Sequence, residues 1–180
     1  MWWRCRGVLL FGLCLLALQC PAWGKDAVEQ QGDVLKIALP AIALGATLFY
    51  EEDYDGSIQW FQAFVTSEAT VYALKKVVDK ERPNGNCCSA FPSGHASMAF
   101  MGAAFIQRRY GWGYGVPAYL AAAYVGYTRI ESDKHDTLDV AAGALIGILS
   151  SYYFVEPYQG IQITPYAAGG SYGLMLSGRW

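Results

Sequence analysis

Charged residues are scarce in this sequence: they make up 16% of its 180 residues, and the formal net charge is only −2. The sequence has no basic tail and no stripe of basic and aromatic residues, so we do not expect nucleic-acid binding. Hydrophobic residues make up 54%, which fits either a large apolar core or partial embedding in a membrane. The length predicts one domain.

Cysteine is also scarce after residue 24, where only the adjacent Cys87 and Cys88 remain. Two neighbouring cysteines form neither a disulfide framework nor a zinc site, and we favour two loop thiols. The alternatives in an oxidising compartment are a strained vicinal disulfide and a bridge between molecules.

Residues 1–24 predict a secretory signal peptide. Arg4 and Arg6 precede the apolar run GVLLFGLCLLAL, and Ala22 and Gly24 supply small residues where a signal peptidase cleaves. We expect cleavage after Gly24, with an uncleaved anchor as the alternative. In either form, the chain after residue 24 begins outside the cytoplasm of a bacterium.

Apolar segments separated by breaks predict an all-α protein, an antiparallel helical bundle over residues 25–156. The expected helices cover residues 34–50, 58–81, 94–107, 116–129 and 136–154. Residues 157–180 differ, because an alternating pattern around a Gly-Gly break predicts a short C-terminal β-hairpin.

The candidates for chemistry are polar residues that interrupt the apolar segments. Lys75 and Arg82 are seven residues apart, two helical turns, and project from one face near a helix end. Ser93 is a natural N-cap. His95 therefore lies in the first turn of a helix, where backbone N–H groups favour anions.

A second polar group lies further along the chain. His135 and Asp139 are four residues apart, so the carboxylate can reach the imidazole and orient it, as in nucleophilic catalysis. Arg129 ends the preceding helix. Each feature alone is a weak signal. Together, three cations, two histidines and one helix N-terminus fit a phosphoryl group at a trigonal-bipyramidal centre.

Membrane sidedness agrees with this grouping. If each apolar segment crosses a bilayer, starting outside, the polar candidates all fall on the periplasmic side, and Arg108 and Arg109 fall on the cytoplasmic side. A soluble antiparallel bundle would gather the same residues at one end. We therefore expect a bacterial inner-membrane protein with a periplasm-facing site, and a soluble periplasmic protein is the alternative.

Three stretches, KKVVDKERP, PSGH and TRIESDKHDTLD, resemble the signature motifs of the type-2 phosphatidic acid phosphatase superfamily, also called lipid phosphate phosphatases. The pattern is a Lys, six residues and Arg-Pro, then Pro-Ser-Gly-His, then Ser-Arg, five residues, His, three residues and Asp. The chain departs from it only at Thr128, where Ser is usual, and a hydroxyl is retained. The resemblance covers residues 34–155 and leaves the tail unexplained.

The resemblance implies a metal-independent phosphatase without a cofactor. His135 would attack phosphorus and form a phosphohistidine, and Asp139 would orient it. His95 would protonate the departing alkoxide and then activate water. The groups implied to hold the phosphoryl oxygens are Lys75, Arg82, Ser93, the backbone N–H of Gly94, and Arg129.

The implied substrate is a phosphorylated lipid: phosphatidic acid, phosphatidylglycerol phosphate, a polyprenyl pyrophosphate or a lipid A phosphate. A soluble periplasmic nonspecific acid phosphatase of the same superfamily is one alternative. A vanadium haloperoxidase-like enzyme, which shares the anion pocket, is another. The odd tail also leaves open a non-enzymatic envelope protein.

Overall fold

The computed structural model describes residues 24–85, 89–158, 160–168 and 171–179. These residues form five α-helices and one antiparallel hairpin, which confirms the predicted all-α bundle with a short β tail. The helices are α2 (Lys25–Tyr50), α3 (Asp55–Val77), α4 (Gly94–Tyr110), α5 (Trp112–Glu131) and α6 (Thr137–Phe154). Residues 1–23 of the expected signal peptide, as well as Cys87 and Cys88, lie outside the described residues.

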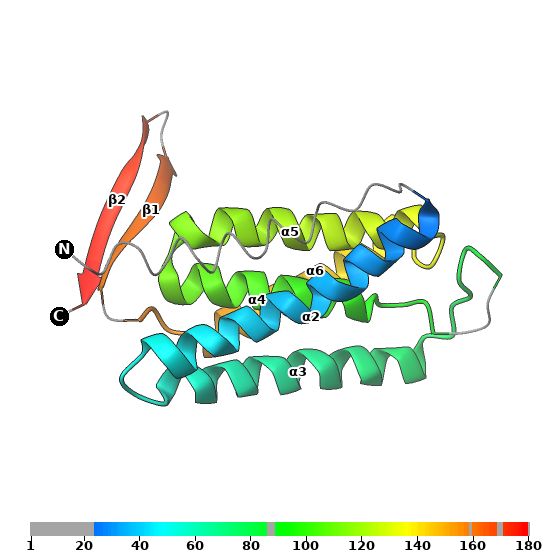
Figure 1. Cartoon of the computed structure of the whole chain (residues 1–180), viewed down its shortest axis with the longest axis horizontal. Coiled ribbons are helices and arrows are strands. Elements are labelled where there is room, and N and C mark those ends of the chain that lie inside the picture. Colours follow the sequence, from blue (N-terminus) through cyan, green and yellow to red (C-terminus); the bar gives the residue numbers. More distant parts are fainter. Residues whose placement is uncertain (1–23, 86–88, 159, 169–170, 180) are drawn as a thin grey trace.

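Helix α4 is the centre of the bundle. It packs against each of the other four helices, and α2 crosses over it diagonally (Figure 1). Its residues are small or apolar on nearly every side, which is the pattern of a helix buried all round. The core includes Met101 and Phe105 of α4, which are fully buried.

Two glycines of α6 let it approach α4 closely. A Cβ at Gly143 would lie 2.2 Å from the carbonyl oxygen of Ser93, and one at Gly147 would lie 2.2 Å from that of Ser97. Small residues four apart are a common device for close helix packing in membranes. The contact joins the N-terminal ends of α4 and α6, which carry PSGH and the His–Asp pair.

Several helix boundaries differ from the expected ones, two of them for local reasons. Helix α2 begins at Lys25 rather than residue 34, because the polar stretch before the apolar run is helical as well. Helix α3 ends at Val77 rather than residue 81. After this end, the carbonyl oxygen of Lys80 accepts a hydrogen bond from the N–H of Ala90 (3.0 Å). The α3–α4 connection therefore forms a hydrogen bond within itself, and the helix does not continue.

The tail forms the predicted hairpin. Strand β1 (Gly160–Ala168) pairs antiparallel with β2 (Ser171–Arg179), in a register that runs from Gly160 opposite Arg179 to Ala168 opposite Ser171. The hairpin stands at the end of the bundle where α4 ends and α5 begins, on the left of Figure 1.

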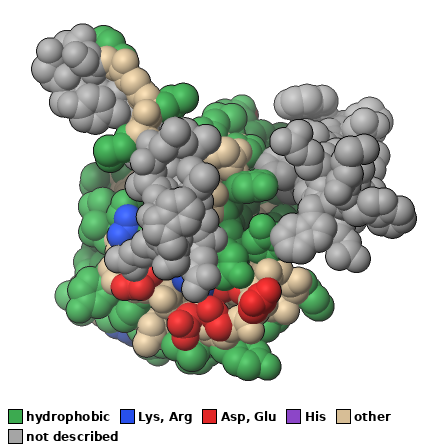
Figure 2. All heavy atoms as spheres, turned by 90° about the vertical axis from the view of Figure 1, so that its left-hand side faces the viewer, with side chains coloured by type: hydrophobic (Ala, Val, Ile, Leu, Met, Phe, Trp, Pro, Cys, Tyr) green, Lys and Arg blue, Asp and Glu red, His purple; other side chains and the backbone are tan. Residues whose placement is uncertain are grey.

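A buried ion pair lies at that same end of the bundle. The guanidinium of Arg109 donates to both carboxylate oxygens of Glu51, at 2.8 and 2.6 Å, and both side chains are almost completely buried. Tyr110 also donates to Glu51. Acidic side chains gather in the lower part of this face, below apolar ones (Figure 2). The ion pair ties the α2–α3 connection to the end of α4.

In the part of the chain that the structure describes, two helices, α2 and α6, are long and apolar enough to cross a membrane. Many large apolar side chains point outward from the bundle, among them Ile37, Phe61 and Leu120, which are more than half exposed. Both features are consistent with a membrane protein.

Candidate active site

The three motifs meet at one end of the bundle, on the right of Figure 1, opposite the hairpin. They come from the end of α3, the connection that follows it, the start of α4 and the α5–α6 connection. A cavity of about 300 Å³ lies between them. Its lining residues are Asp33, Lys36, Lys75, Arg82, Gly94, His95, Arg129, Lys134 and His135.

The structure brings six of the eight predicted site residues to the cavity wall. The other two, Ser93 and Asp139, are fully buried behind it. Ser93 caps α4 as predicted: its side chain accepts a hydrogen bond from the N–H of Ala96, and its own N–H donates to the carbonyl oxygen of Asp139 at 2.9 Å. Ser93 thereby joins the two histidine-bearing segments.

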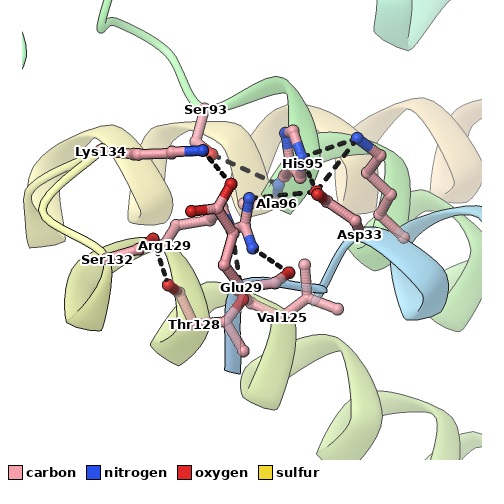
Figure 3. Close-up of polar contacts among 11 residues, drawn as sticks. Glu29, Asp33, Ser93, His95, Ala96, Val125, Thr128, Arg129, Ser132 and Lys134 are labelled. Atoms are coloured by element: carbon pink, nitrogen blue, oxygen red, sulfur yellow. Dashed lines mark hydrogen bonds and ion pairs between the residues drawn. The ribbon is translucent and has the colours of Figure 1, made fainter. Parts of the chain in front are cut away.

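His95 projects from the first turn of α4 and meets two charged side chains of α2. Its Nε2 lies 2.7 Å from Oδ1 of Asp33 and 2.7 Å from Nζ of Lys36. Figure 3 shows the Asp33 carboxylate between His95 and Arg129. The imidazole therefore has an anion and a cation beside the same nitrogen.

His135 lies almost completely buried just before α6, near Asp139 of its first turn. Nδ1 of His135 is 3.6 Å from Oδ2 of Asp139, which is longer than a hydrogen bond. Among the described residues this Nδ1 has no hydrogen-bond partner. The predicted His–Asp pair is in place, separated by a short gap.

The surroundings of His135 favour its neutral form. Burial, and next the ammonium of Lys75, lower the pKa of His135 from 6.5 to about 4, although Asp139 opposes this. A neutral imidazole keeps a free electron pair for nucleophilic attack.

Arg129 is the most firmly held of the predicted cations. It is fully buried and donates to the carbonyl oxygen of Glu29 at 2.7 Å and to Oδ1 of Asp33 at 3.1 Å. Its Nε donates to the hydroxyl of Thr128 at 3.1 Å, and that hydroxyl donates to the carbonyl oxygen of Val125. Thr128 thus uses its hydroxyl to orient Arg129.

Lys75 and Arg82 reach the cavity from the other side. Nζ of Lys75 donates to the carbonyl oxygen of Ser89 at 2.6 Å, which ties α3 to the segment before PSGH. Nε of Arg82 is buried without an acceptor in the described part of the chain. A buried donor of this kind is costly unless a ligand or water accepts from it.

Sequence reasoning missed three charged residues that line the cavity: Asp33, Lys36 and Lys134. Lys134 forms an ion pair with Glu29 of α2. One signal was available: Asp33 and Lys36 are three residues apart on one face of a helix that is otherwise mainly apolar from there on. Their shared partner on α4, His95, lies about 60 residues away in the sequence.

The charges make the cavity an anion site. Five cationic side chains line it, from Lys36, Lys75, Arg82, Arg129 and Lys134, against the single carboxylate of Asp33. The described residues contain no group of three or more His, Cys, Asp or Glu side chains arranged to hold a metal ion. Cationic side chains and helix N–H groups are available to hold phosphoryl oxygens.

Fold and site together define a helical protein with a cationic cavity that contains two histidines. The family model of the PAP2 superfamily matches residues 58–160. The chain therefore belongs to this superfamily, as the motifs predict. It is therefore a phosphatase, a phosphoric monoester hydrolase.

Relatives and solved structures extend the comparison. The chain is 30% identical over 147 residues to the lipid A 4′-phosphatase of Helicobacter pylori, covering 76% of this chain and 73% of that protein. The structure of Aquifex aeolicus LpxE superposes with a TM-score of 0.63 at 23% identity, covering 81% of this chain and 93% of the other. A transmembrane PAP2-type phosphatidylglycerolphosphate phosphatase from Bacillus subtilis gives 0.61 at 20% identity, with 82% and 83% coverage. Both structures share the fold.

Proposed function

We propose that the protein removes phosphate from a phosphorylated lipid whose apolar chain lies in a groove beside the cationic cavity. This groove has a volume of about 310 Å³ and is lined by Ile37, Pro40, Ala41, Leu44, Trp60, Phe64 and Met98. Met98 follows His95 by one turn of α4, and Ile37 follows Lys36 directly on α2. This adjacency of a cationic cavity and an apolar groove is the observation that carries the proposal.

The lipid is a phosphate or diphosphate ester of the kind expected from the sequence. The name of the Helicobacter pylori relative, a lipid A 4′-phosphatase, supports a lipid A phosphate as the first substrate to test. Phosphatidic acid, phosphatidylglycerol phosphate and polyprenyl pyrophosphate present the same chemistry, an anionic phosphoryl group on an apolar body.

The first step transfers the phosphoryl group to His135. Nε2 of His135 attacks phosphorus, the bond from phosphorus to the lipid oxygen breaks, and His95 gives its proton to that oxygen. Asp139 holds Nδ1–H of His135, which requires the 3.6 Å gap to close by roughly half an ångström.

Cations hold the transferred group while its charge develops. Lys75, Arg82 and Arg129 line the cavity and hold the phosphoryl oxygens, and the N–H of Gly94 adds a donor at the start of α4. Ser93 supports this donor by capping the helix.

The second step releases phosphate. A water oxygen attacks the phosphorus of phosphohistidine, the phosphorus–nitrogen bond breaks, and the water proton passes to His95. Inorganic phosphate leaves, His135 is neutral again, and His95 carries the proton needed for the next turnover.

Placement in the inner membrane, with the cavity facing the periplasm, is part of the proposal. The 26 residues of α2 span about 39 Å at 1.5 Å per residue, enough to cross a hydrocarbon layer of about 30 Å. In this arrangement residues 1–24 are a signal peptide, residues 25–156 are the phosphatase domain, and residues 157–180 are a tail at the opposite end.

Purified protein in detergent should be assayed against lipid phosphates and soluble phosphomonoesters, with H135A as the inactive reference. We expect a higher kcat/KM for the lipids. Filling the groove by Met98→Trp should reduce activity on lipids and spare a soluble ester, whereas Leu120→Trp, on an exposed face of α5, should change neither.

Other results would favour the alternatives. Equal or better activity on soluble esters, together with release by osmotic shock, would support the soluble acid phosphatase. Halide oxidation with bound vanadate would support the haloperoxidase-like enzyme, and a purified protein inactive on every ester would support a non-enzymatic role.

A further inference from the structure

Lys80 joins two carboxylates at the start of α6. It lies in the α3–α4 connection, between the motif cations Lys75 and Arg82, but the motif does not specify this position. Its Nζ lies 2.6 Å from Oδ2 of Asp136 and 2.6 Å from Oδ1 of Asp139. Lys80 does not line the cavity.

The two oxygens of Asp139 have separate partners. Oδ1 accepts from Lys80, whereas Oδ2 accepts from the N–H of Asp136 at 3.2 Å and faces Nδ1 of His135 at 3.6 Å. In return, the Asp136 side chain accepts from the N–H of Asp139 at 2.9 Å, which completes a capping box. The rotation of the Asp139 carboxylate is thus fixed from both ends.

We propose that Lys80 is a positioning residue that holds the Asp139 carboxylate with its second oxygen toward His135. This inference rests on the proposed role of His135 as the nucleophile. Lys80 acts through Asp139 and touches neither the substrate nor the phosphoryl group.

The environment of Lys80 supports an ion-paired ammonium at this place. Although burial opposes it, the hydrogen bonds to Asp136 and Asp139 raise the pKa of Lys80. The hydrogen bond from Lys80 lowers the pKa of Asp136. The backbone of Lys80 is also anchored, because its carbonyl oxygen accepts from Ala90.

Loss of Lys80 should change the ionisation of His135. Without Lys80, the ammonium that offsets the charge of Asp139 is lost, and the full negative charge of this carboxylate acts on the imidazole, which raises the pKa of His135. The other charged groups near His135 stay in place; they are Lys75 on α3, Arg82 in the α3–α4 connection, Arg129 on α5, and Lys134 in the α5–α6 connection.

The test compares Lys80→Met with Lys80→Arg, and uses Lys76→Met as the matched control. Lys76 is an exposed lysine at the end of α3 that lies over the ring of Tyr72. The readout is the rate of phosphoenzyme formation on nitrophenyl phosphate as a function of pH. We expect K80M to lose about tenfold or more, as is typical for groups that orient a reactive residue, with KM little changed. The acid limb of the pH profile of K80M should move to higher pH. K80R should recover most of the activity.

Asp136→Asn separates positioning from general stability. Asn still caps α6, and Lys80 keeps Asp139, so the acid limb should stay where it is in the wild type. If K80M keeps the wild-type rate and the wild-type acid limb of the pH profile, while H135A and D139N are inactive, the proposed role of Lys80 is wrong. If K80M and D136N lose activity equally without a pH shift, Lys80 is only structural. If H135A remains active, the proposed function itself fails.

Discussion

Asp33 and His95 are hydrogen-bonded across 62 residues of sequence, with 2.7 Å between Oδ1 and Nε2. Nζ of Lys36 lies equally close to the same nitrogen. A protonated Nε2 can donate to Asp33, and a deprotonated Nε2 can accept from Lys36. Helix α2 therefore offers a partner to His95 in both of the states through which a general acid passes.

Asp33→Asn should slow the release of a poor leaving group. An amide stabilises a protonated imidazole less than a carboxylate does, so kcat on an alkyl or lipid phosphate should fall about tenfold or more. Phosphoenzyme formation on nitrophenyl phosphate should change much less. Asp26→Asn, in the exposed first turn of the same helix, is the control and should behave as wild type. Equal losses on both substrates would contradict a role through His95.

The two histidines should separate in the same assay. His135→Ala should be inactive on every substrate, because His135 makes the bond to phosphorus in the proposed mechanism. His95→Ala should lose about a hundred- to ten-thousandfold on a lipid phosphate, the usual contribution of a general acid, and far less in the phosphoenzyme burst on nitrophenyl phosphate. Identical fractional losses for both variants on both substrates would refute this division of roles.

Vanadate should inhibit the enzyme, and chelators should not. Lys75, Arg82 and Arg129 can hold the oxygens of a trigonal-bipyramidal vanadate as they do those of the phosphoryl group in the proposed mechanism. Activity should be measured with vanadate, with EDTA, and with EDTA followed by a divalent ion. Loss in EDTA that a metal restores would overturn the expectation.

His135 should stay neutral well below pH 6.5. Its pKa, lowered to about 4 by burial and by Lys75, means that the unfolded chain binds a proton between pH 6.5 and 4 that the folded chain does not. Stability should therefore fall as the pH drops through this window. NMR titration of the labelled imidazole in detergent should give a midpoint near 4, and a midpoint near 6.5 would contradict the buried setting.

Gly143→Ala should destabilise the contact between α6 and the start of α4. The added Cβ would meet the carbonyl oxygen of Ser93 at 2.2 Å and push the start of α4 away, at a cost of about 1–3 kcal/mol. Gly45→Ala is the control, because nothing lies within 4 Å of its added Cβ, and it should leave stability unchanged or improve it. Thermal inactivation of the two variants should differ by several degrees.

Local patterns predicted much of the molecule because their causes are local. Ser93 marks the start of α4, and the four-residue spacing of His135 and Asp139 places both at the start of α6. The hairpin follows from alternation around a Gly-Gly break. In each case the partners are near one another in the sequence, at most 19 residues apart in the hairpin.

The contributions of α2 and Lys80 could not be predicted in this way. Asp33 and Lys36 reach His95 only because α2 crosses over α4, and Lys80 reaches Asp139 across 59 residues. Asp33 and Lys36 both line the cavity, although the expected first helix begins only at residue 34. Tertiary packing creates these contacts, and no periodic pattern in the sequence predicts them.

Helix α2 lies outside the part of the chain that the family model covers. It lies before residues 58–160, the part that matches the PAP2 superfamily, yet it supplies Asp33 and Lys36 to the cavity and four residues to the groove. A helix that lines both the cavity and the groove thus lies outside the segment that carries the motifs. Exchange of α2 between members of the superfamily offers a route to new lipid preferences with the same histidines in place.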